Sequence, residues 1–163
     1  NRRYTKEQFV ELALRIRREI PDIAITTDII VGFPGETKED VDETLDVIEQ
    51  VRFDGAFTFV YSKRTGTPAA AMENQVPKEE VKKQFDRVLD AVQRISREMS
   101  SRFEGDTEEV LVEEVNEQDE TLLTGRLSNN LLVHFPADRS LIGTLAKVKL
   151  KECKGFYYMG ELQ

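Results

Sequence analysis

Residues 23–37 read IAITTDIIVGFPGET and contain the boundary between a buried strand and a helix. The stretch from Ile23 to Val31 is rich in β-branched residues, which favour strands, and a turn of glycine and proline ends it. Thr37 then has the residue type of a helix N-cap, with acidic residues in the first turn after it. This order predicts a strand that leads through a tight turn into a helix.

The elements on both sides of this stretch complete a βαβ unit. A helix is predicted from about Lys6 to Glu19, because Thr5 and Gln8 have the spacing of a capping box. A second strand is expected at Phe57–Tyr61, and two strands joined by a helix in this way are parallel. Since a sheet of two strands alone is marginal, we predict that residues 1–104 are a piece of a larger α/β sheet or barrel.

The last third of the chain has the pattern of a small barrel. A long amphipathic helix is predicted from Pro77 to Phe103, and after Gly105 the apolar period becomes that of strands. Five short strands are expected, at Thr107–Val115, Leu122–Leu127, Leu131–Phe135, Thr144–Glu152 and Phe156–Leu162. Five strands in so short a segment indicate a closed barrel of the oligonucleotide-binding type. The predicted domains are therefore residues 1–104 and 105–163.

Composition excludes several classes of protein. The chain carries 23 Lys and Arg against 31 Asp and Glu, a formal charge of −8, which argues against diffuse binding of nucleic acid but not against a local basic face. No apolar segment is long enough to cross a bilayer, so no membrane partner is expected. The single cysteine, Cys153, excludes an internal disulfide framework and favours a reducing compartment such as the cytoplasm. One cysteine and one histidine also cannot hold an iron–sulfur cluster or a structural zinc ion.

Two loops follow the carboxyl ends of the predicted parallel strands and should lie on one rim, where ligands bind in α/β folds. In residues 32–37 the glycines allow a ligand to approach the backbone and the helix start offers N–H groups to an anion. From these residues alone, a tight turn before a capped helix is the favoured interpretation. The second of these loops spans residues 61–68, and its part from Thr65 to Pro68 is predicted to have no regular secondary structure. Its Arg64 is suited to hold a carboxylate or phosphate, and a solvated loop arginine is the equal alternative.

One strand of the predicted barrel carries a basic row. Alternation puts Lys147, Lys149 and Lys151 on the face opposite the apolar residues of the same strand, and Arg126 and Lys154 would extend the row. Such a row contacts RNA phosphates without reading the sequence. An ordinary solvated strand face is the alternative interpretation.

Two further residues have reactive side chains. His134 lies between two apolar residues, so alternation directs it away from the barrel core, where it is either simply exposed or stacked on a base. Cys153 has no histidine near it in the sequence to activate its thiol, and we interpret it as structural.

Several motifs resemble those of the radical SAM methylthiotransferases, above all the MiaB family, which modifies tRNA. They are TDIIVGFPGET at residues 27–37, YSKR at 61–64 and GTPA at 66–69. The resemblance continues through TGR at 124–126, VHF at 133–135, LIG at 141–143 and GEL at 160–162. That tail looks like a TRAM domain, a small β-barrel that binds RNA. The fold implied is an α/β partial (βα) barrel fragment followed by a five-stranded OB-like β-barrel.

The resemblance implies that the chain is part of a tRNA methylthiotransferase. Such an enzyme adds a methylthio group to isopentenyl-adenosine beside the anticodon by radical SAM chemistry. Its cofactors would be S-adenosylmethionine and two 4Fe-4S clusters, whose cysteine ligands this chain lacks. Its partners would be tRNA and the N-terminal domains of the parent protein. The fragment alone is therefore expected to contain no catalytic residue and to be inactive.

The resemblance also assigns site residues by motif. Val31, Gly32 and Phe33 would line the S-adenosylmethionine pocket. Arg64, Gly66 and Thr67 would face the mouth of the active site, although Thr65 departs from the proline or acidic residue of the family pattern. Arg126 and Asn130 match positions of the TRAM pattern and are expected to bind RNA. The three lysines of the basic row are predicted from alternation and charge alone.

Two other functions compete with this one. The first is a non-catalytic RNA-binding module in which the helical part presents the barrel. The second is a sister methylthiotransferase that acts on a ribosomal protein or on another tRNA adenosine.

Overall fold

The computed structural model describes residues 3–163, which form two compact units that meet between residues 96 and 97. The first unit contains helices α1 (Lys6–Glu19), α2 (Lys38–Val51) and α3 (Pro68–Ala71), the greater part of α4 (Lys78–Ser101), and strands β1 (Thr26–Val31) and β2 (Gly55–Val60). The second contains strands β3 (Thr107–Val115), β4 (Leu123–Leu127), β5 (Leu132–Phe135), β6 (Leu145–Cys153) and β7 (Tyr157–Leu162), and the short 3-10 helix η1 (Arg139–Leu141). Across the described residues, no helix is both long and apolar enough to cross a membrane.

Helices α1 and α2 both begin at capping boxes. The side chain of Thr5 accepts the backbone N–H of Gln8, and the Gln8 side chain accepts the backbone N–H of Thr5. Thr37 and Asp40 exchange the same pair of bonds at the start of α2. Each pair satisfies two N–H groups that a helix start leaves without an intrahelical partner. The predicted start of both helices is confirmed.

Arg17 links α1 to the segments around the sheet. Its guanidinium forms an ion pair of 2.8 Å with Asp54 and donates to the carbonyls of Val51 and Arg52, at 3.2 and 2.6 Å. It also donates to the carbonyl of Ile23, so one half-buried side chain connects α1, the end of α2 and the approaches to both strands.

Strand β1 is shorter than predicted, because the segment before it bonds outside the sheet. The carbonyl of Ile23 accepts from Arg17, and the N–H of Ile25 donates to the Asp54 carboxylate at 2.8 Å. These groups are not available for a strand ladder, so β1 begins at Thr26 rather than Ile23. A second correction concerns the loop expected at Thr65–Pro68. Thr67 is the N-cap of α3 and Pro68 its first residue, a position where proline costs no hydrogen bond.

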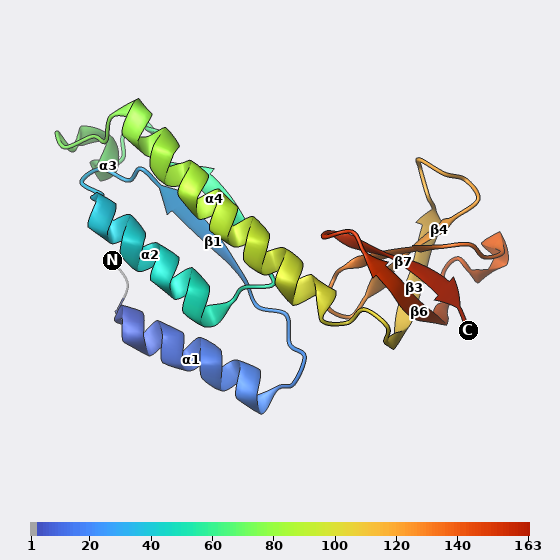
Figure 1. The fold of residues 1–163 in the computed structure, drawn as a ribbon. Coiled ribbons are helices and arrows are strands. Elements are labelled where there is room, and N and C mark those ends of the chain that lie inside the picture. The colour runs from blue at the N-terminus through green and yellow to red at the C-terminus, as the bar shows by residue number, and fades with distance from the viewer. Residues whose placement is uncertain (1–2) are drawn as a thin grey trace. The chain divides into compact units, whose positions relative to one another are not determined.

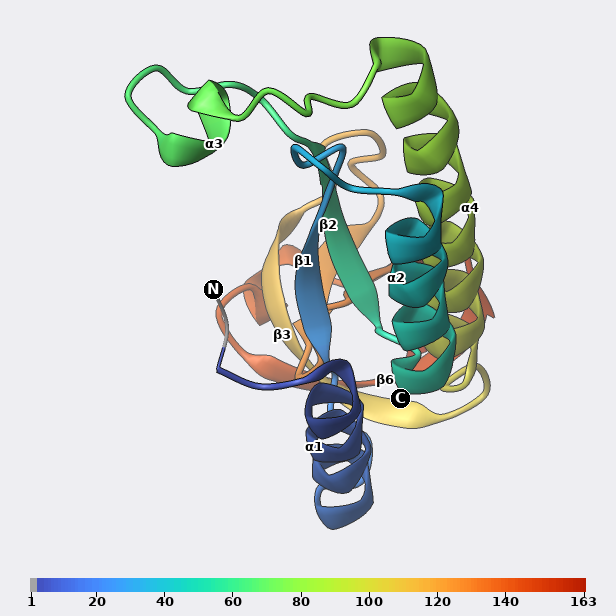
Figure 2. The same ribbon diagram turned by 90° about the vertical axis from the view of Figure 1, so that its left-hand side faces the viewer.

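Strands β1 and β2 form a parallel sheet with helices on one face. The pairing runs from Thr26 opposite Gly55 to Val31 opposite Val60. Figure 1 shows the two strands beside α2 and α4, and Figure 2 shows both of these helices on the same side of the sheet. An ion pair between Asp42 and Arg87 joins the helices to each other, and the core beneath them is apolar. The buried apolar residues of this unit are Val10, Ala13, Ile29, Val31, Val41, Ile48, Val51, Phe53, Val88, Val92 and Ile95.

The opposite face of this sheet keeps large apolar side chains exposed. Ile30 is 54% exposed in β1, and Phe57 and Phe59 are 68% and 51% exposed in β2. Parallel sheets normally bury both faces under helices. The exposed face therefore has the composition of a buried layer.

The second unit is a closed five-stranded barrel in the order β3-β4-β5-β7-β6, which confirms the predicted barrel. Only the pairing of β5 with β7 is parallel. Closure leaves no unpaired strand edge in a sheet of this size. The core consists of alternate residues from all five strands, which are Val110, Val112, Leu123, Leu127, Val133, Phe135, Ala146, Val148, Leu150 and Tyr158.

The inner surface of the barrel leaves no room for a side chain at Gly160. A Cβ atom there would lie 2.5 Å from a methyl group of Val148 and 2.9 Å from one of Val133, and both valines are fully buried. We predict that Gly160→Ala lowers the free energy of unfolding of the barrel by about 1–3 kcal/mol through overpacking. Urea denaturation followed by circular dichroism measures this change.

Gly55→Ala is the matched control, because a Cβ atom at Gly55 in β2 meets only a methyl group of Thr26 at 3.7 Å. The control should change stability by less than about 0.5 kcal/mol. Equal effects of the two substitutions would contradict the packing described for Gly160.

Candidate functional site

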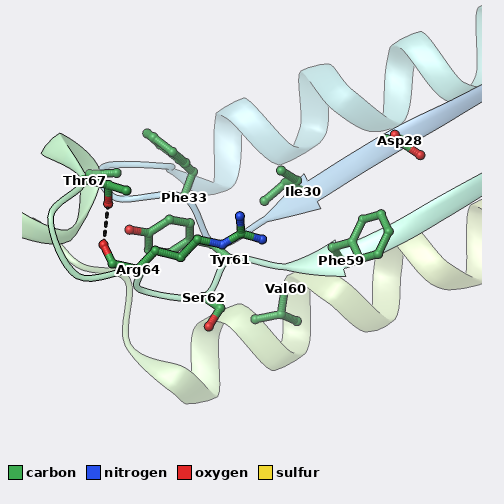
Figure 3. Close-up of a pocket in the computed structure, with 10 residues that line it drawn as sticks. Asp28, Ile30, Phe33, Phe59, Val60, Tyr61, Ser62, Arg64 and Thr67 are labelled. Carbon is green, nitrogen blue, oxygen red and sulfur yellow. Dashed lines mark hydrogen bonds between the residues drawn. The ribbon is translucent and has the colours of Figure 1, made fainter.

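A cavity of about 640 Å³ lies on the open face of the two-stranded sheet, at the carboxyl ends of both strands. Ile30, Phe33 and Phe59 give it an apolar surface, and Asp28, Ser62 and Arg64 supply polar groups. Figure 3 shows these side chains around the strand ends, with Phe33 and Thr67 contributed by the loops that follow. An apolar cavity with a few polar groups at this end of parallel strands is a usual place for a small-molecule site.

The turn after β1 is stabilised by bonds within the protein. The Glu36 carboxylate accepts the N–H of Gly32, and the N–H of Gly35 donates to the carbonyl of Asn74 at 2.8 Å. Gly32 has φ +82°, and a Cβ atom there would lie 2.8 Å from Val81 of α4. These two glycines are therefore required by the turn and its packing, and their N–H groups are already used. Burial of Glu36 raises the pKa of its carboxyl above the ordinary value.

The three residues expected to hold the cofactor occupy different places. Phe33 is 45% exposed, lines the cavity and meets the ring of Tyr61 edge-on at 5.3 Å between centroids. Val31 is only 1% exposed and points into the core under the helices, and Gly32 packs against Val81. Among these three, only the Phe33 side chain reaches the cavity.

Of the residues expected at the mouth, Arg64 and Thr67 line the cavity, whereas Gly66 does not. The Thr67 hydroxyl donates to the Arg64 carbonyl at 2.8 Å, which closes the loop (Figure 3). The Arg64 side chain extends from this loop in the direction of Ile30 and Phe59. Within residues 3–163 no carboxylate forms an ion pair with Arg64, so its guanidinium is available to an anionic group.

Tyr61 supplies a further polar group that the sequence did not single out. Its hydroxyl is buried and has no hydrogen-bond partner among the described residues, although Tyr61 lines the cavity. A buried hydroxyl without a partner costs about 1–3 kcal/mol. No group of three His, Cys, Asp or Glu side chains suited to a metal ion occurs among the described residues.

The basic row on β6 lies between acidic side chains of the neighbouring strands. Lys147 is opposite Glu109 of β3, and Lys149 is opposite Glu161 of β7. Lys151 forms an ion pair of 2.6 Å with Glu161, which lowers the pKa of that carboxyl. The alternation predicted for this strand is confirmed, but each of the three lysines has a carboxylate opposite or beside it.

Arg126 forms hydrogen bonds to both Glu113 and Asn130. Two guanidinium nitrogens of Arg126 donate to the two Glu113 carboxylate oxygens at 2.8 and 3.0 Å, and a third donates to the Asn130 carbonyl and side-chain oxygen at 3.3 Å. The Glu113 carboxylate raises the pKa of Arg126, and its own pKa is lowered in return. Asn130 has φ +74° in the turn between β4 and β5. Most donors of Arg126 are therefore engaged in bonds within the barrel, to β3 and to the turn between β4 and β5.

His134 lies on the outer face of the barrel, as predicted, and it is half-buried in a polar network. Its Nδ1 atom is 3.1 Å from Asn116 Nδ2 and 3.1 Å from the hydroxyl of Thr124. The Asn116 side-chain oxygen accepts the N–H groups of Gln118 and Asp119, both at 2.9 Å. Because this fixes the amide orientation, Nδ2 is the atom that faces His134, and it can only donate.

The network therefore determines the protonation of His134. Since Nδ1 accepts from Asn116, the ring is neutral and its proton is on Nε2. Burial also lowers the pKa of the imidazole, which favours the same neutral form of the ring. The ring also lies against Tyr157, with 4.7 Å between the centroids.

Sequence reasoning missed the partners of His134. Asn116 is in the loop before β4, and Tyr157 reaches the site only because β7 pairs in parallel with β5. No local pattern indicates a parallel pairing between strands that are not consecutive. The Asn-x-x-Asp-like turn at 116–119 was the one available sign of a structured loop.

Comparison with known proteins first concerns the barrel. Residues 101–162 match the family model of the TRAM domain. The match and the closed barrel define this part of the chain as a TRAM domain.

Curated relatives extend the match to nearly the whole chain. Over 162 residues, 99% of this chain, it is 59% identical to the tRNA-2-methylthio-N(6)-dimethylallyladenosine synthase of Lachnoclostridium phytofermentans and 53% identical to that of Acetivibrio thermocellus. A protein of the same name from Thermoanaerobacter sp. strain X514 is 51% identical. The resemblance to the MiaB family of methylthiotransferases is thus confirmed. The chain spans about a third of the length of these relatives, 36% of the first and 34% of the other two.

The neutral state of His134 leads to a prediction about its titration. Nuclear magnetic resonance of the only histidine in the chain should show the Nε2–H tautomer and a pKa below about 6.5. Neutral His134 favours the folded state, so its contribution is complete above about pH 6.5 and declines as the pH falls below that value.

Asn116→Asp supplies the contrast. A carboxylate in place of the amide would accept a proton from Nδ1, so the pKa of His134 should rise above that of the unaltered chain. A wild-type pKa at or above the ordinary value, or an Nδ1–H tautomer, would contradict the network described here.

Proposed function

We propose that the chain is part of a tRNA methylthiotransferase, in which residues 1–104 belong to an α/β partial barrel that binds S-adenosylmethionine and residues 105–163 bind tRNA. The observation that carries the proposal is the apolar cavity at the carboxyl ends of β1 and β2, on a sheet face whose side chains resemble a buried layer. The proposal is supported by the identity of this chain, 59% and 53% over 99% of its length, to two tRNA-2-methylthio-N(6)-dimethylallyladenosine synthases.

The residues around the cavity fit parts of S-adenosylmethionine. Phe33 and Phe59 offer apolar surface to an adenine ring, and Arg64 is suited to the methionine carboxylate. When bound beside a reduced iron–sulfur cluster, this cofactor supplies the radical that abstracts hydrogen from an inert C–H bond. Val31 and Gly32 support Phe33 from behind through packing on the helices.

The two 4Fe-4S clusters of the proposed parent do not fit this chain alone. Three thiolates are needed for the cluster that binds the cofactor, and the chain has a single cysteine. The cluster ligands would come from the N-terminal domains of the parent, which are also partners in the proposed function. The proposed enzyme acts in the cytoplasm, where tRNA is modified.

The names of the relatives favour a tRNA adenosine as substrate over a ribosomal protein. They also favour a part of an enzyme over a free-standing RNA-binding module. In both cases the barrel is the proposed RNA-binding part, and Arg126, Asn130 and the three lysines of the basic row are the residues expected to bind RNA.

We predict that the chain alone forms no methylthio product. Expressed in a strain that lacks its own tRNA methylthiotransferase, it should leave isopentenyl-adenosine unmodified in mass spectra of total tRNA. The full-length relative from Lachnoclostridium phytofermentans is the positive control. Methylthiolated adenosine produced by the chain alone would refute the prediction.

A second prediction tests the basic row. Replacement of Lys147, Lys149 and Lys151 by alanine should weaken binding of a fluorescent anticodon stem-loop in anisotropy measurements. It should also flatten the dependence of log K on log salt concentration, by about 0.7 for each phosphate that the protein no longer neutralises. Lys147 should contribute more than Lys151, whose charge is compensated by Glu161.

The matched control replaces the same number of exposed lysines on α4, namely Lys78, Lys82 and Lys83. It changes the net charge equally but leaves the barrel intact. Equal weakening of RNA binding in both variants would assign the effect to net charge and discard the basic row.

A further inference from the structure

A second cavity, of about 360 Å³, lies on the outer face of the barrel. Its apolar surface comes from Leu132 of β5 and from Tyr157 and Met159 of β7. Its polar groups include Asn116, Thr124 and His134, the three members of the network described above. The cavity thus combines an aromatic wall with a fixed set of hydrogen-bonding groups.

The network orients one donor of His134. Because Nδ1 is occupied by Asn116 and Thr124, the proton of the neutral ring is on Nε2. No hydrogen-bond partner of Nε2 is found in the described part of the chain. His134 therefore offers one N–H donor that its surroundings leave unused, from a ring that rests against Tyr157.

The charges around the cavity are negative. Glu114, Glu117 and Asp119 line it, and none of the Lys or Arg side chains in residues 3–163 does. Hydrogen bonds from Thr121 lower the pKa of Asp119, so this carboxylate stays charged at neutral pH. The cavity repels phosphate but accepts hydrogen bonds from exocyclic amino groups.

We propose that this cavity binds a single unpaired nucleobase of the RNA, a contact separate from the basic row. The base stacks on the Tyr157 ring and accepts a hydrogen bond at its edge from Nε2–H of His134, whose ring is tilted 49° from that of Tyr157. Unpaired bases are commonly recognised by aromatic stacking and by bonds to their edges. The proposal rests on the proposed RNA-binding function and adds to it the place and chemistry of base recognition.

The proposed base-binding cavity and the basic row lie on two different surfaces of the barrel. The basic row lies on β6, whereas the cavity lies over β4, β5 and β7. Phosphate contacts then depend strongly on salt, and base stacking does not. This difference separates the two contributions by experiment.

Tyr157→Ala in the full chain is the central variant. It should weaken binding of the anticodon stem-loop about 5- to 150-fold, the range for loss of one stacked base, and leave the salt dependence unchanged. Tyr157→Phe keeps the ring and should stay within about twofold of the unaltered chain. Leu145→Ala, at an exposed apolar position of β6, should have no effect.

Nuclear magnetic resonance of His134 provides a readout that needs no variant. Its ring resonances should shift when the stem-loop is added and shift much less with free adenosine, which offers a nucleobase without the RNA strand. Unmoved resonances, or unchanged affinity of folded Tyr157→Ala, would overturn the inference while RNA binding itself stands. Equal affinity for adenosine would overturn it in favour of a nucleoside site. If the unaltered chain binds no RNA, the proposed function fails and the inference with it.

Discussion

A parallel sheet is stable when both of its faces are covered, and β1 and β2 have helices on one face only. This constraint explains most features of the first unit. The covered face is packed by valine and isoleucine, and Arg17 binds the ends of its elements together. The open face has side chains of the same apolar kind that no element of this unit covers. A ligand cavity at the strand ends is the natural use of such a face, because apolar surface and converging loops are already in place.

The barrel does not depend on a covering layer, because closure pairs the edges of all its strands with one another. Its core is complete, and its interactions with other molecules are therefore left to the outer face. There several charged side chains are paired, as Arg126 is with Glu113 and Lys151 with Glu161. The His134 network differs, because its internal bonds are made and still one donor remains directed outward.

Much of this architecture was predictable from the sequence, for identifiable reasons. Capping residues such as Thr5 and Thr37 act within one helical turn, and the alternation of β6 is local, so both could be predicted from short segments. The start of β1 could not, because it depends on Arg17 and Asp54, which are distant in the chain. The same holds for the site residues. Alternation placed the lysines on the outer face, but only the strand register shows the carboxylates of Glu109 and Glu161 beside them.

The bulge in β3 has a consequence for the chemistry of the outer face. The register shifts between Val112 and Glu114, and as a result two successive residues, Glu113 and Glu114, serve the same side of the barrel. One neutralises Arg126, and the other lies at the rim of the second cavity. A regular strand would turn one of them inward. Deletion of one of these two residues would hardly change the composition of the chain. It would nevertheless remove either the carboxylate that pairs with Arg126 or the carboxylate at the rim of the second cavity.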